Sequence, residues 1–364
     1  GRLHNHTNGD AQRMYRSSDV IESAARTGDP VARLRDHLIR NGVDASSLAE
    51  MEDRVRADLR EAARTAQFSA EPSACPAAKA PLPGHLTGEQ IEYRGGQERE
   101  LVMLEAIRAV LDARLESDER ITLFGEDIED PKGDVFGITR GLSQKYGRRV
   151  RNSPLSESLI MGVSIGRALA GEHPVGFLQF ADFLPIAYNQ IFAELGSMYW
   201  RTDGGWQVPV ILMVTAGGYR PGLGPFHAST LEALVAHTPG VDVFMPSDAA
   251  DAAGLLNAAF DSGRPTIFFY PKNQLNDRSR ATSRDVRRQL VPPGIARRIS
   301  SGDDLTIVAY GNTVPLAAHA VEVLSGYGVS VDLLDLRSLV PWDVERVTAS
   351  AERTGRMIVV HEDN

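Results

Sequence analysis

Val208-Pro209-Val210-Ile211-Leu212-Met213-Val214 and Thr266-Ile267-Phe268-Phe269-Tyr270 are two apolar segments that decide the fold class. Neither alternates apolar with polar residues, as a strand with one wet face would, so each is predicted to be a strand buried on both faces. Strands of this kind occur in parallel sheets that helices cover on both sides. The two segments therefore indicate an α/β fold with a doubly wound parallel sheet.

The same pattern continues around these segments. Further strands are predicted at 121–124, 175–180 and 241–245, and helices at 101–115 and 157–170. After Pro292-Pro293-Gly294 a second alternation begins, with strands at 305–310, 329–334 and 357–361 and helices at 314–324 and 343–351. We predict one α/β domain at 100–285 and a smaller one at 290–364. Because the second has few strands and stops just after one, we expect the natural polypeptide to continue beyond Asn364.

The first hundred residues follow another pattern. Met51, Val55 and Leu59 recur at helical spacing after a capping-box sequence that begins at Ser47, which predicts an amphipathic helix that needs a partner surface. The stretch after it is rich in proline, alanine and glycine, and proline favours extended backbone. We predict a helical tail at 1–70 and a linker at 71–99, with the single cysteine, Cys75, as an exposed linker thiol.

Composition excludes several classes of protein. The chain has 364 residues, 42% of them hydrophobic, and a net charge of -9. It offers no basic field for nucleic acid, no apolar run long enough to span a membrane and no signal-like N-terminus. One cysteine permits neither an intramolecular disulfide nor a cysteine metal cage. We expect a globular cytoplasmic protein.

Ser153-Pro154-Leu155-Ser156-Glu157, followed by Gly162 and Gly166, is the first sequence that suggests chemistry. The two glycines lie one helical turn apart and permit another backbone to approach. On these residues alone, Glu157 is as well explained as an acid stabilised by the dipole at a helix N-terminus.

Further motifs follow in order along the chain. They are Gly125-Glu126-Asp127, Gln179-Phe180-Ala181-Asp182-Phe183, Ala187-Tyr188-Asn189-Gln190-Ile191, His227, Ala236-His237-Thr238-Pro239-Gly240 and Leu336-Arg337-Ser338-Leu339-Val340-Pro341. With Ser156-Glu157 they make residues 101–364 resemble the beta subunit of the decarboxylating component of pyruvate and branched-chain 2-oxo acid dehydrogenases. The resemblance implies a pyrimidine-type thiamine diphosphate-binding domain followed by a transketolase C-terminal-like domain.

The start of the chain carries a second resemblance. Arg2-Leu3-His4-Asn5-His6-Thr7, with Asp10 and Tyr15-Arg16 after it, looks like the His-Gly-His-Ser loop of the alpha subunit of that component. Without this context, His4 and His6 would be ordinary loop histidines or metal ligands without a third partner. The chain therefore resembles an alpha-subunit tail fused to a beta subunit.

The resemblance assigns roles to individual residues. Glu157 matches the glutamate that hydrogen-bonds a ring nitrogen of the aminopyrimidine, and His227 and His6 match two histidines that orient substrate and handle protons. Phe183 matches an aromatic that packs on the pyrimidine, although simple core packing also explains it. Gln179 and Glu126 match neighbouring positions of the cofactor pocket, where a purely structural role is equally open.

The diphosphate half of such a site is missing from the sequence. The family holds the diphosphate and Mg²⁺ with a Gly-Asp-Gly loop, and this chain contains none. We therefore predict no metal ligands here. An alpha-type partner subunit should bring that half, in an assembly that resembles a heterotetramer of two alpha and two beta subunits.

Three departures loosen the substrate assignment. His227-Ala228-Ser229 stands where the family commonly has His-Ser-Gln, and Asn5 and Thr7 replace Gly and Ser in the alpha-like loop. Ser262 and Arg264 replace the Asp and Asn that help bind potassium in branched-chain relatives, which puts a potassium site in doubt.

The resemblance implies an enzyme that makes an acyl carbanion equivalent from a 2-oxo acid by decarboxylation. It passes the acyl unit to the thiol of a lipoyl or carrier domain. The first alternative is a transketolase-like transfer of a two-carbon hydroxyacyl unit from a ketose phosphate to a lipoyl or acyl carrier protein. The second is a non-catalytic scaffold, which would have no use for Glu157. The sequence leaves donor, acceptor and stoichiometry open.

Overall fold

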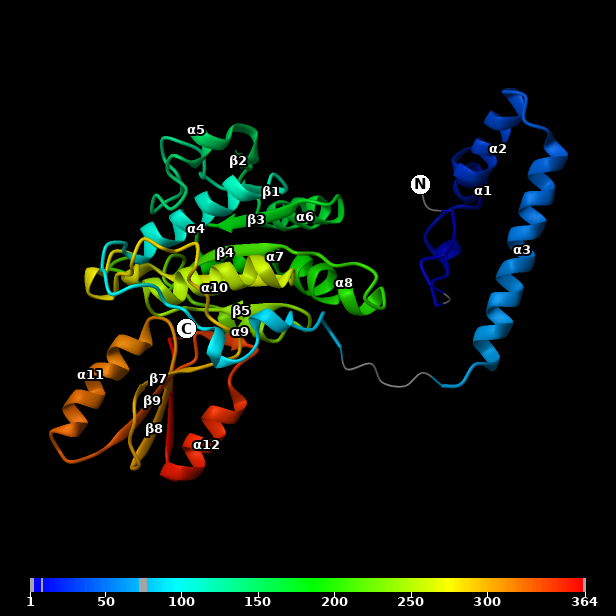
Figure 1. Ribbon diagram of the computed structural model, residues 1–364. Coiled ribbons are helices and arrows are strands. Elements are labelled where there is room, and N and C mark those ends of the chain that lie inside the picture. The colour runs from blue at the N-terminus through cyan, green and yellow to red at the C-terminus, as the bar shows by residue number, and fades with distance from the viewer. Residues whose placement is uncertain (1–2, 8, 72–76, 363–364) are drawn as a thin grey trace. The chain divides into compact units, whose positions relative to one another are not determined.

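The computed structural model describes residues 3–7, 9–71 and 77–362 (Figure 1). The chain divides into two compact units, Gly1–Ala74 and Cys75–Asn364. Arg2, Cys75 and Asn364 lie outside the described residues. Across the described ranges, no helix combines the length and the apolar character needed to cross a membrane.

The larger unit is built on a seven-stranded sheet whose strand order is β10-β5-β6-β4-β3-β1-β2. Six strands run parallel, as the apolar segments predict, and only β10 is antiparallel to its neighbour β5. The strands are β1 (Ile121–Gly125), β2 (Val150–Asn152), β3 (His173–Leu178), β4 (Ile211–Ala216), β5 (Asp242–Phe244), β6 (Thr266–Pro271) and β10 (Ser338–Val340).

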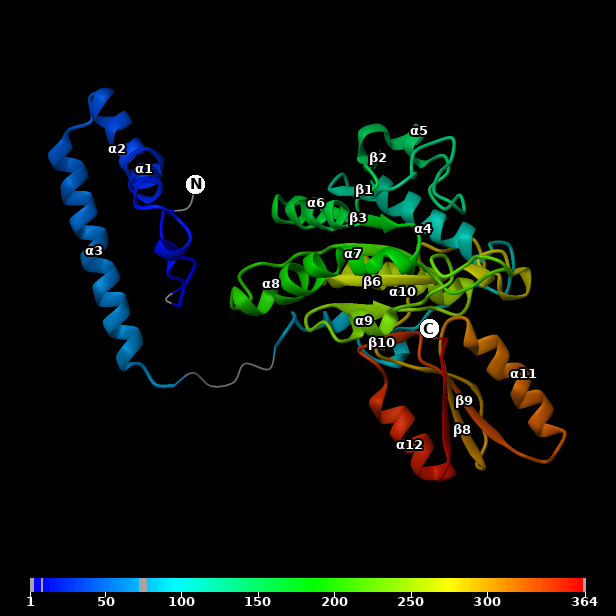
Figure 2. The same cartoon turned by 180° about the vertical axis from the view of Figure 1, so that it is seen from behind.

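Helices cover both faces of this sheet (Figures 1 and 2). Strand β4 explains why, because Ile211 and Met213 enter one core while Leu212 and Val214 enter the other. The first core also contains α4 (Met103–Ser117) and α10 (Ala249–Ser262), and the second contains α6 (Glu157–Leu169), α7 (Leu184–Asn189) and α8 (Gly196–Arg201). A π-helical turn, Gln190–Leu195, joins α7 to α8, and the short helices are α5 (Leu142–Tyr146) and α9 (Glu232–Ala236).

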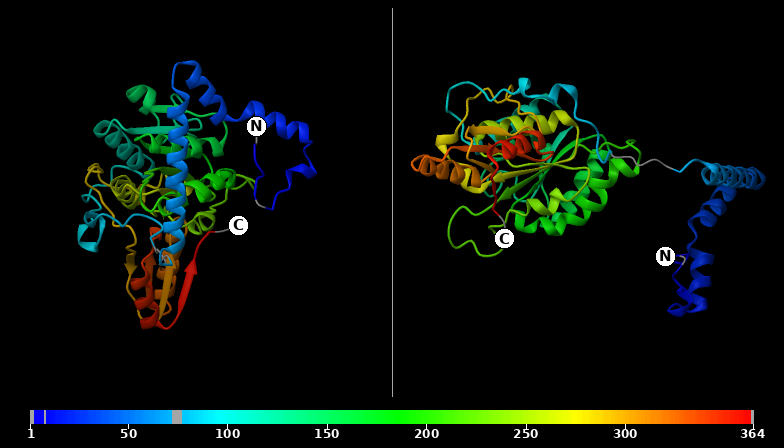
Figure 3. Two further views of the ribbon diagram at one scale, coloured as in Figure 1. Left: turned by 90° about the vertical axis from the view of Figure 1, so that its right-hand side faces the viewer. Right: turned by 90° about the horizontal axis from the view of Figure 1, so that it is seen from below.

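A four-stranded sheet of order β11-β8-β9-β7 forms the second domain of this unit (Figure 3). Its strands are β7 (Arg297–Ser300), β8 (Leu305–Ala309), β9 (Val331–Asp335) and β11 (Met357–Val360). One face packs on α11 (Thr313–Ser325) and the other on α12 (Val344–Thr354). The three predicted strands are parallel, and β7 adds antiparallel to β9.

The segment after the N-terminal unit packs closely on the first sheet. Leu86 is fully buried, Tyr93 pairs with Leu290 in a backbone bridge, and Lys79 Nζ lies 2.5 Å from a carboxylate oxygen of Asp242. Its prolines predict a linker over 71–99, and from residue 77 onward the chain is instead attached to the sheet domain. Proline removes backbone donors, but it leaves the flanking side chains free to pack.

The N-terminal unit contains α1 (Ser18–Gly28), α2 (Pro30–Arg40) and α3 (Ala45–Phe68). Helix α3 matches the predicted amphipathic helix, but Asp44 caps it, accepting a hydrogen bond from the Ser47 backbone N–H at 2.9 Å. The capping box predicted at Ser47 is therefore wrong by one turn. Met51, Val55 and Leu59, the apolar face of α3, are each more than half exposed.

Candidate functional site

The predicted residues of the larger unit gather where the parallel strands end. Glu126 follows β1 and Gln179 follows β3, while Glu157 begins α6 after β2. The carboxyl ends of parallel strands meet at one edge of a sheet, which is where such folds place ligands. Gly125 lets the ends of β1 and β3 approach closely, because a Cβ there would lie 2.6 Å from the Phe177 carbonyl oxygen.

Glu126 is a buried acid, and one of its carboxyl oxygens accepts no hydrogen bond from the described residues. It is 3% exposed, and its Oε1 has no hydrogen-bond partner among the described residues. Burial, together with the nearby charges of Glu157 and Asp127, raises the pKa of Glu126 to about 7, although a hydrogen bond from the Ser156 backbone opposes the shift. Glu126 therefore stays largely protonated in mildly acidic solution and is about half ionised near pH 7.

Glu157 occupies a different environment beside it. It is half-buried, and it is the first residue of α6, after the extended N-cap Ser156. The positive end of the helix dipole stabilises a carboxylate at this position. The site thus pairs a buried acid with a more accessible one at a helix N-terminus.

Gln179 holds the loop that carries Glu126. Its Nε2 donates to the Glu126 carbonyl oxygen, and its Oε1 accepts from the Val135 backbone N–H at 3.2 Å. Thr215 Oγ1, from β4, donates to the carbonyl oxygen of Gln179 itself. The amide side chain therefore ties the end of β1 to the end of β3.

Aromatic rings line the other side of the edge. The His227 ring lies 4.6 Å from the Phe180 ring and 6.0 Å from the Phe183 ring, measured between centroids, with both pairs edge to face. Phe136 contacts Phe180 at 6.3 Å in the same way. The structure therefore brings Phe183 and His227 together around Phe180, a residue to which the sequence analysis assigned no role.

These residues fit one half of thiamine diphosphate. A flat heteroaromatic ring that exchanges protons needs an accessible carboxylate and an apolar ring to pack on, and Glu157 and Phe183 supply those groups. The unpartnered Oε1 of Glu126 adds a further polar atom. Within the described part of the chain, no group of three His, Cys, Asp or Glu side chains could hold a metal ion.

His6 belongs to the N-terminal unit. Its backbone N–H donates to Asp10 Oδ2 at 2.8 Å, and the Tyr15 hydroxyl donates to the same carboxylate at 2.8 and 2.9 Å. Asp10 thus organises the loop around His6, and the His6 side chain is exposed.

Two charged residues near His227 were not predicted as site residues. Lys272, just after β6, donates from Nζ to the His227 carbonyl oxygen at 2.8 Å. Asp182 accepts from the backbone N–H groups of Ala228 at 3.3 Å and Ser229 at 3.2 Å. The signal that could have found Lys272 is its position at the carboxyl end of an apolar strand.

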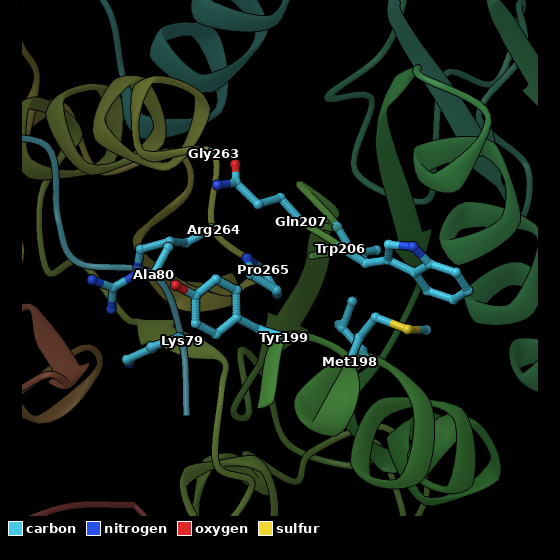
Figure 4. A pocket seen from close by; sticks show the side chains of 11 residues that line it. Lys79, Ala80, Met198, Tyr199, Trp206, Gln207, Gly263, Arg264 and Pro265 are labelled. Atoms are coloured by element: carbon cyan, nitrogen blue, oxygen red, sulfur yellow. The ribbon is translucent and has the colours of Figure 1, made fainter. Parts of the chain in front are cut away.

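A small pocket lies at the opposite edge of the sheet (Figure 4). It is lined by Val208 and Pro265, which precede β4 and β6, and by Lys79, Tyr199 and Arg264. Lys79 and Arg264 both pair with the fully buried Asp242. Two side-chain cations, those of Lys79 and Arg264, therefore lie beside this pocket, and the residues of the carboxyl edge do not line it.

Three protein-family models match successive parts of the chain. Residues 99–278 match the transketolase pyrimidine-binding domain, residues 294–364 match the transketolase C-terminal domain, and residues 2–75 match the dehydrogenase E1 component. A split-gene transketolase solved as an inactive beta4 tetramer has a similar fold, with a TM-score of 0.59, 24% identity, and coverage of 72% of this chain and 80% of that one. The fold is that of the transketolase-type thiamine diphosphate proteins.

Relatives with similar sequences identify the family within this fold class. The chain is 36% identical over 263 residues to the beta subunit of 2-oxoisovalerate dehydrogenase from Bacillus subtilis, covering 71% of this chain and 79% of the relative. It is also 36% identical over 265 residues to the beta subunit of the pyruvate dehydrogenase E1 component from Acholeplasma laidlawii, covering 72% and 79%. The chain belongs to the family of thiamine diphosphate-dependent E1 beta subunits of 2-oxo acid dehydrogenases.

Proposed function

We propose that this chain forms the aminopyrimidine-activating half of an enzyme that decarboxylates a 2-oxo acid and transfers the acyl unit to a lipoyl or carrier-protein thiol. One observation carries the proposal: the accessible Glu157 lies at a helix N-terminus beside the buried Glu126, whose Oε1 has no partner among the described residues. The relatives named as pyruvate and 2-oxoisovalerate dehydrogenase subunits favour a 2-oxo acid donor over a ketose phosphate.

When bound, thiamine diphosphate supplies the nucleophilic carbon and the electron sink for decarboxylation. Glu157 exchanges a proton with a ring nitrogen of the aminopyrimidine, which requires a carboxyl group. Glu126, whose backbone Gln179 holds, has a pKa raised to about 7, so at neutral pH it adds less negative charge beside Glu157 than an ordinary glutamate would. Phe183 packs on the pyrimidine ring.

His227 and His6 handle protons as the acyl group leaves for the acceptor thiol. His227 lies in a loop at the carboxyl edge of the first sheet, against the rings of Phe180 and Phe183. Imidazole is suited to this work because it gains and loses a proton near neutral pH.

A separate alpha-type subunit with a Gly-Asp-Gly loop binds the diphosphate and Mg²⁺ in this proposal, in a cytoplasmic heterotetramer. The exposed apolar face of α3, formed by Met51, Val55 and Leu59, supports a protein partner. The match of residues 2–75 to the dehydrogenase E1 component supports an E1-type assembly.

Hydrogen–deuterium exchange at the thiazolium carbon of the bound cofactor tests the role of Glu157. In the assembly with its partner, Glu157→Gln should slow this exchange more than about a hundredfold, because an amide cannot share the proton. The control Glu119→Gln changes an exposed acid at the end of the sheet remote from the site and should exchange at the wild-type rate. Wild-type exchange in assembled Glu157→Gln would refute the proposal.

A further inference from the structure

His227 lies in a loop whose base is closed but whose backbone forms no helix or strand. The Gly217 N–H donates to the Ser229 carbonyl oxygen at 3.1 Å, which makes 217–229 a single loop between β4 and α9. Phe226, just before His227, is 63% exposed. The position of the His227 imidazole must therefore be set by contacts from outside the loop.

Two oppositely charged side chains, which follow two different strands, form hydrogen bonds with the C-terminal part of this loop, residues 227–229. Lys272, after β6, donates to the His227 carbonyl oxygen at 2.8 Å. Asp182, after β3, accepts from the next two backbone N–H groups, those of Ala228 and Ser229. Two consecutive peptide groups, the one joining His227 to Ala228 and the one joining Ala228 to Ser229, are thus fixed to the carboxyl edge of the sheet.

The same lysine also reaches the ring that contacts the imidazole. Lys272 Nζ lies 4.8 Å from the centroid of the Phe180 ring, and Phe180 contacts the His227 ring at 4.6 Å. A cation over an aromatic face is attracted by the ring. Lys272 therefore holds both the backbone of His227 and the ring against which its side chain packs.

Lys272 keeps most of its positive charge although it is buried, because two carboxylates lie near it. Lys272 is only 4% exposed, and burial lowers its pKa to about 8, while Asp182 and Glu362 act in the opposite direction. Lys272 therefore remains mostly protonated at neutral pH. Glu362 also binds the other arm of the loop, since its Oε1 accepts from the Gly218 N–H at 3.2 Å.

We propose that Lys272 and Asp182 are positioning residues that fix the His227 imidazole for acyl transfer. This inference rests on the proposed role of His227 and adds two residues that act through it. A shift of about 1 Å in a reacting group can cost on the order of a hundredfold in rate. Three hydrogen bonds to two successive peptide groups are a direct means of preventing such a shift.

The test compares acyl transfer with cofactor activation in the enzyme assembled with its partner. Pyruvate or 3-methyl-2-oxobutanoate is the donor, and acyl transfer is followed as the mass gained by a lipoyl domain. Lys272→Met should lower kcat for transfer about tenfold to a hundredfold with KM nearly unchanged, and Lys272→Arg should restore most of it because arginine can still donate. Asp182→Ala should behave like Lys272→Met, and Asp182→Asn, which keeps a carbonyl acceptor, should be much milder.

Thiazolium exchange should stay within about twofold of wild type in all four variants, because it depends on Glu157 and not on His227. Lys145→Met is the matched control, since Lys145 pairs with Asp112 on the exposed surface at 2.8 Å. His227→Ala sets the reference for complete loss of the imidazole.

Three results would overturn the inference. Normal kcat in Lys272→Met while His227→Ala is impaired would show that the Lys272 hydrogen bond is dispensable. A rise in KM alone would make Lys272 a substrate contact, and a parallel loss of thiazolium exchange would make its role merely structural. Normal transfer by His227→Ala would remove the proposed role of His227 itself, a failure distinguishable from the first three.

Discussion

Replacing Glu126 with glutamine should change how the stability of the chain depends on pH. The folded protein keeps the Glu126 proton up to its pKa of about 7, whereas an ordinary glutamate releases it near 4.5. The stabilising contribution is therefore complete below about pH 4.5 and is lost as pH rises through 7. At 1.36 kcal/mol for each pKa unit, the loss amounts to about 3 kcal/mol.

Glu126→Gln has no such proton to lose. Between pH 5 and pH 8 the free energy of unfolding of the variant should therefore rise relative to wild type by about 2.5 kcal/mol, or about 4 °C in Tm for a unit of this size. Urea and thermal unfolding at a series of pH values measure this difference. Glu119→Gln, which removes an exposed carboxyl group, should show a difference that stays within about 0.5 kcal/mol.

A flat difference between wild type and Glu126→Gln from pH 5 to pH 8 would refute this reasoning. The partner carboxylate provides a second check, because the charge of Glu157 contributes to the raised pKa of Glu126. In a Glu157→Gln background the fall in stability attributed to Glu126 should begin at the same pH, near 4.5, and end at a lower pH than in wild type. An unchanged end point would mean that the charge of Glu157 does not contribute to the pKa of Glu126.

Two substitutions away from the site should destabilise the larger unit. Arg337, fully buried, donates to Asp251 at 3.0 Å and to Glu92 at 2.8 Å, so Arg337→Met should cost about 3–5 kcal/mol in urea unfolding by leaving buried carboxylates short of a partner. Lys79→Met removes one of two cations on Asp242 and should cost about 1–3 kcal/mol in the same assay, with a stability equal to wild type as the contradicting result.

The local parts of the fold could be predicted because they depend on local signals. Unbroken apolar segments identified β4 and β6, and their double-sided burial confirmed the parallel sheet. Strand β10 was missed, because Ser338–Val340 lies in sequence between β9 and β11 of the second sheet and yet pairs with β5 of the first. Pairing over such a separation depends on tertiary contacts such as those of Arg337, which no sequence period reveals.

In the candidate site, too, short sequence motifs could be recognised, whereas contacts between residues distant in sequence could not. Glu157 and Glu126 were found from motifs, and their unequal environments emerged only from packing around the strand ends. Lys272 lies 45 residues from His227 in sequence and meets it only through the sheet. Their roles in catalysis remain predictions that the exchange and transfer experiments address.

The unequal burial of Glu126 and Glu157 determines which of the two acids holds a proton more tightly. Two ionised acids side by side repel each other, so one of them is driven to hold its proton, and burial selects which one. Glu126 is 3% exposed, and its Oε1 has no partner in the part of the chain that the structure describes, so it is the acid that holds the proton, whereas Glu157 lies at the stabilising end of a helix dipole. In the proposed mechanism, the proton on Glu126 leaves Glu157 as the acid that exchanges a proton with the cofactor, and this difference between the two acids diminishes as Glu126 ionises through pH 7.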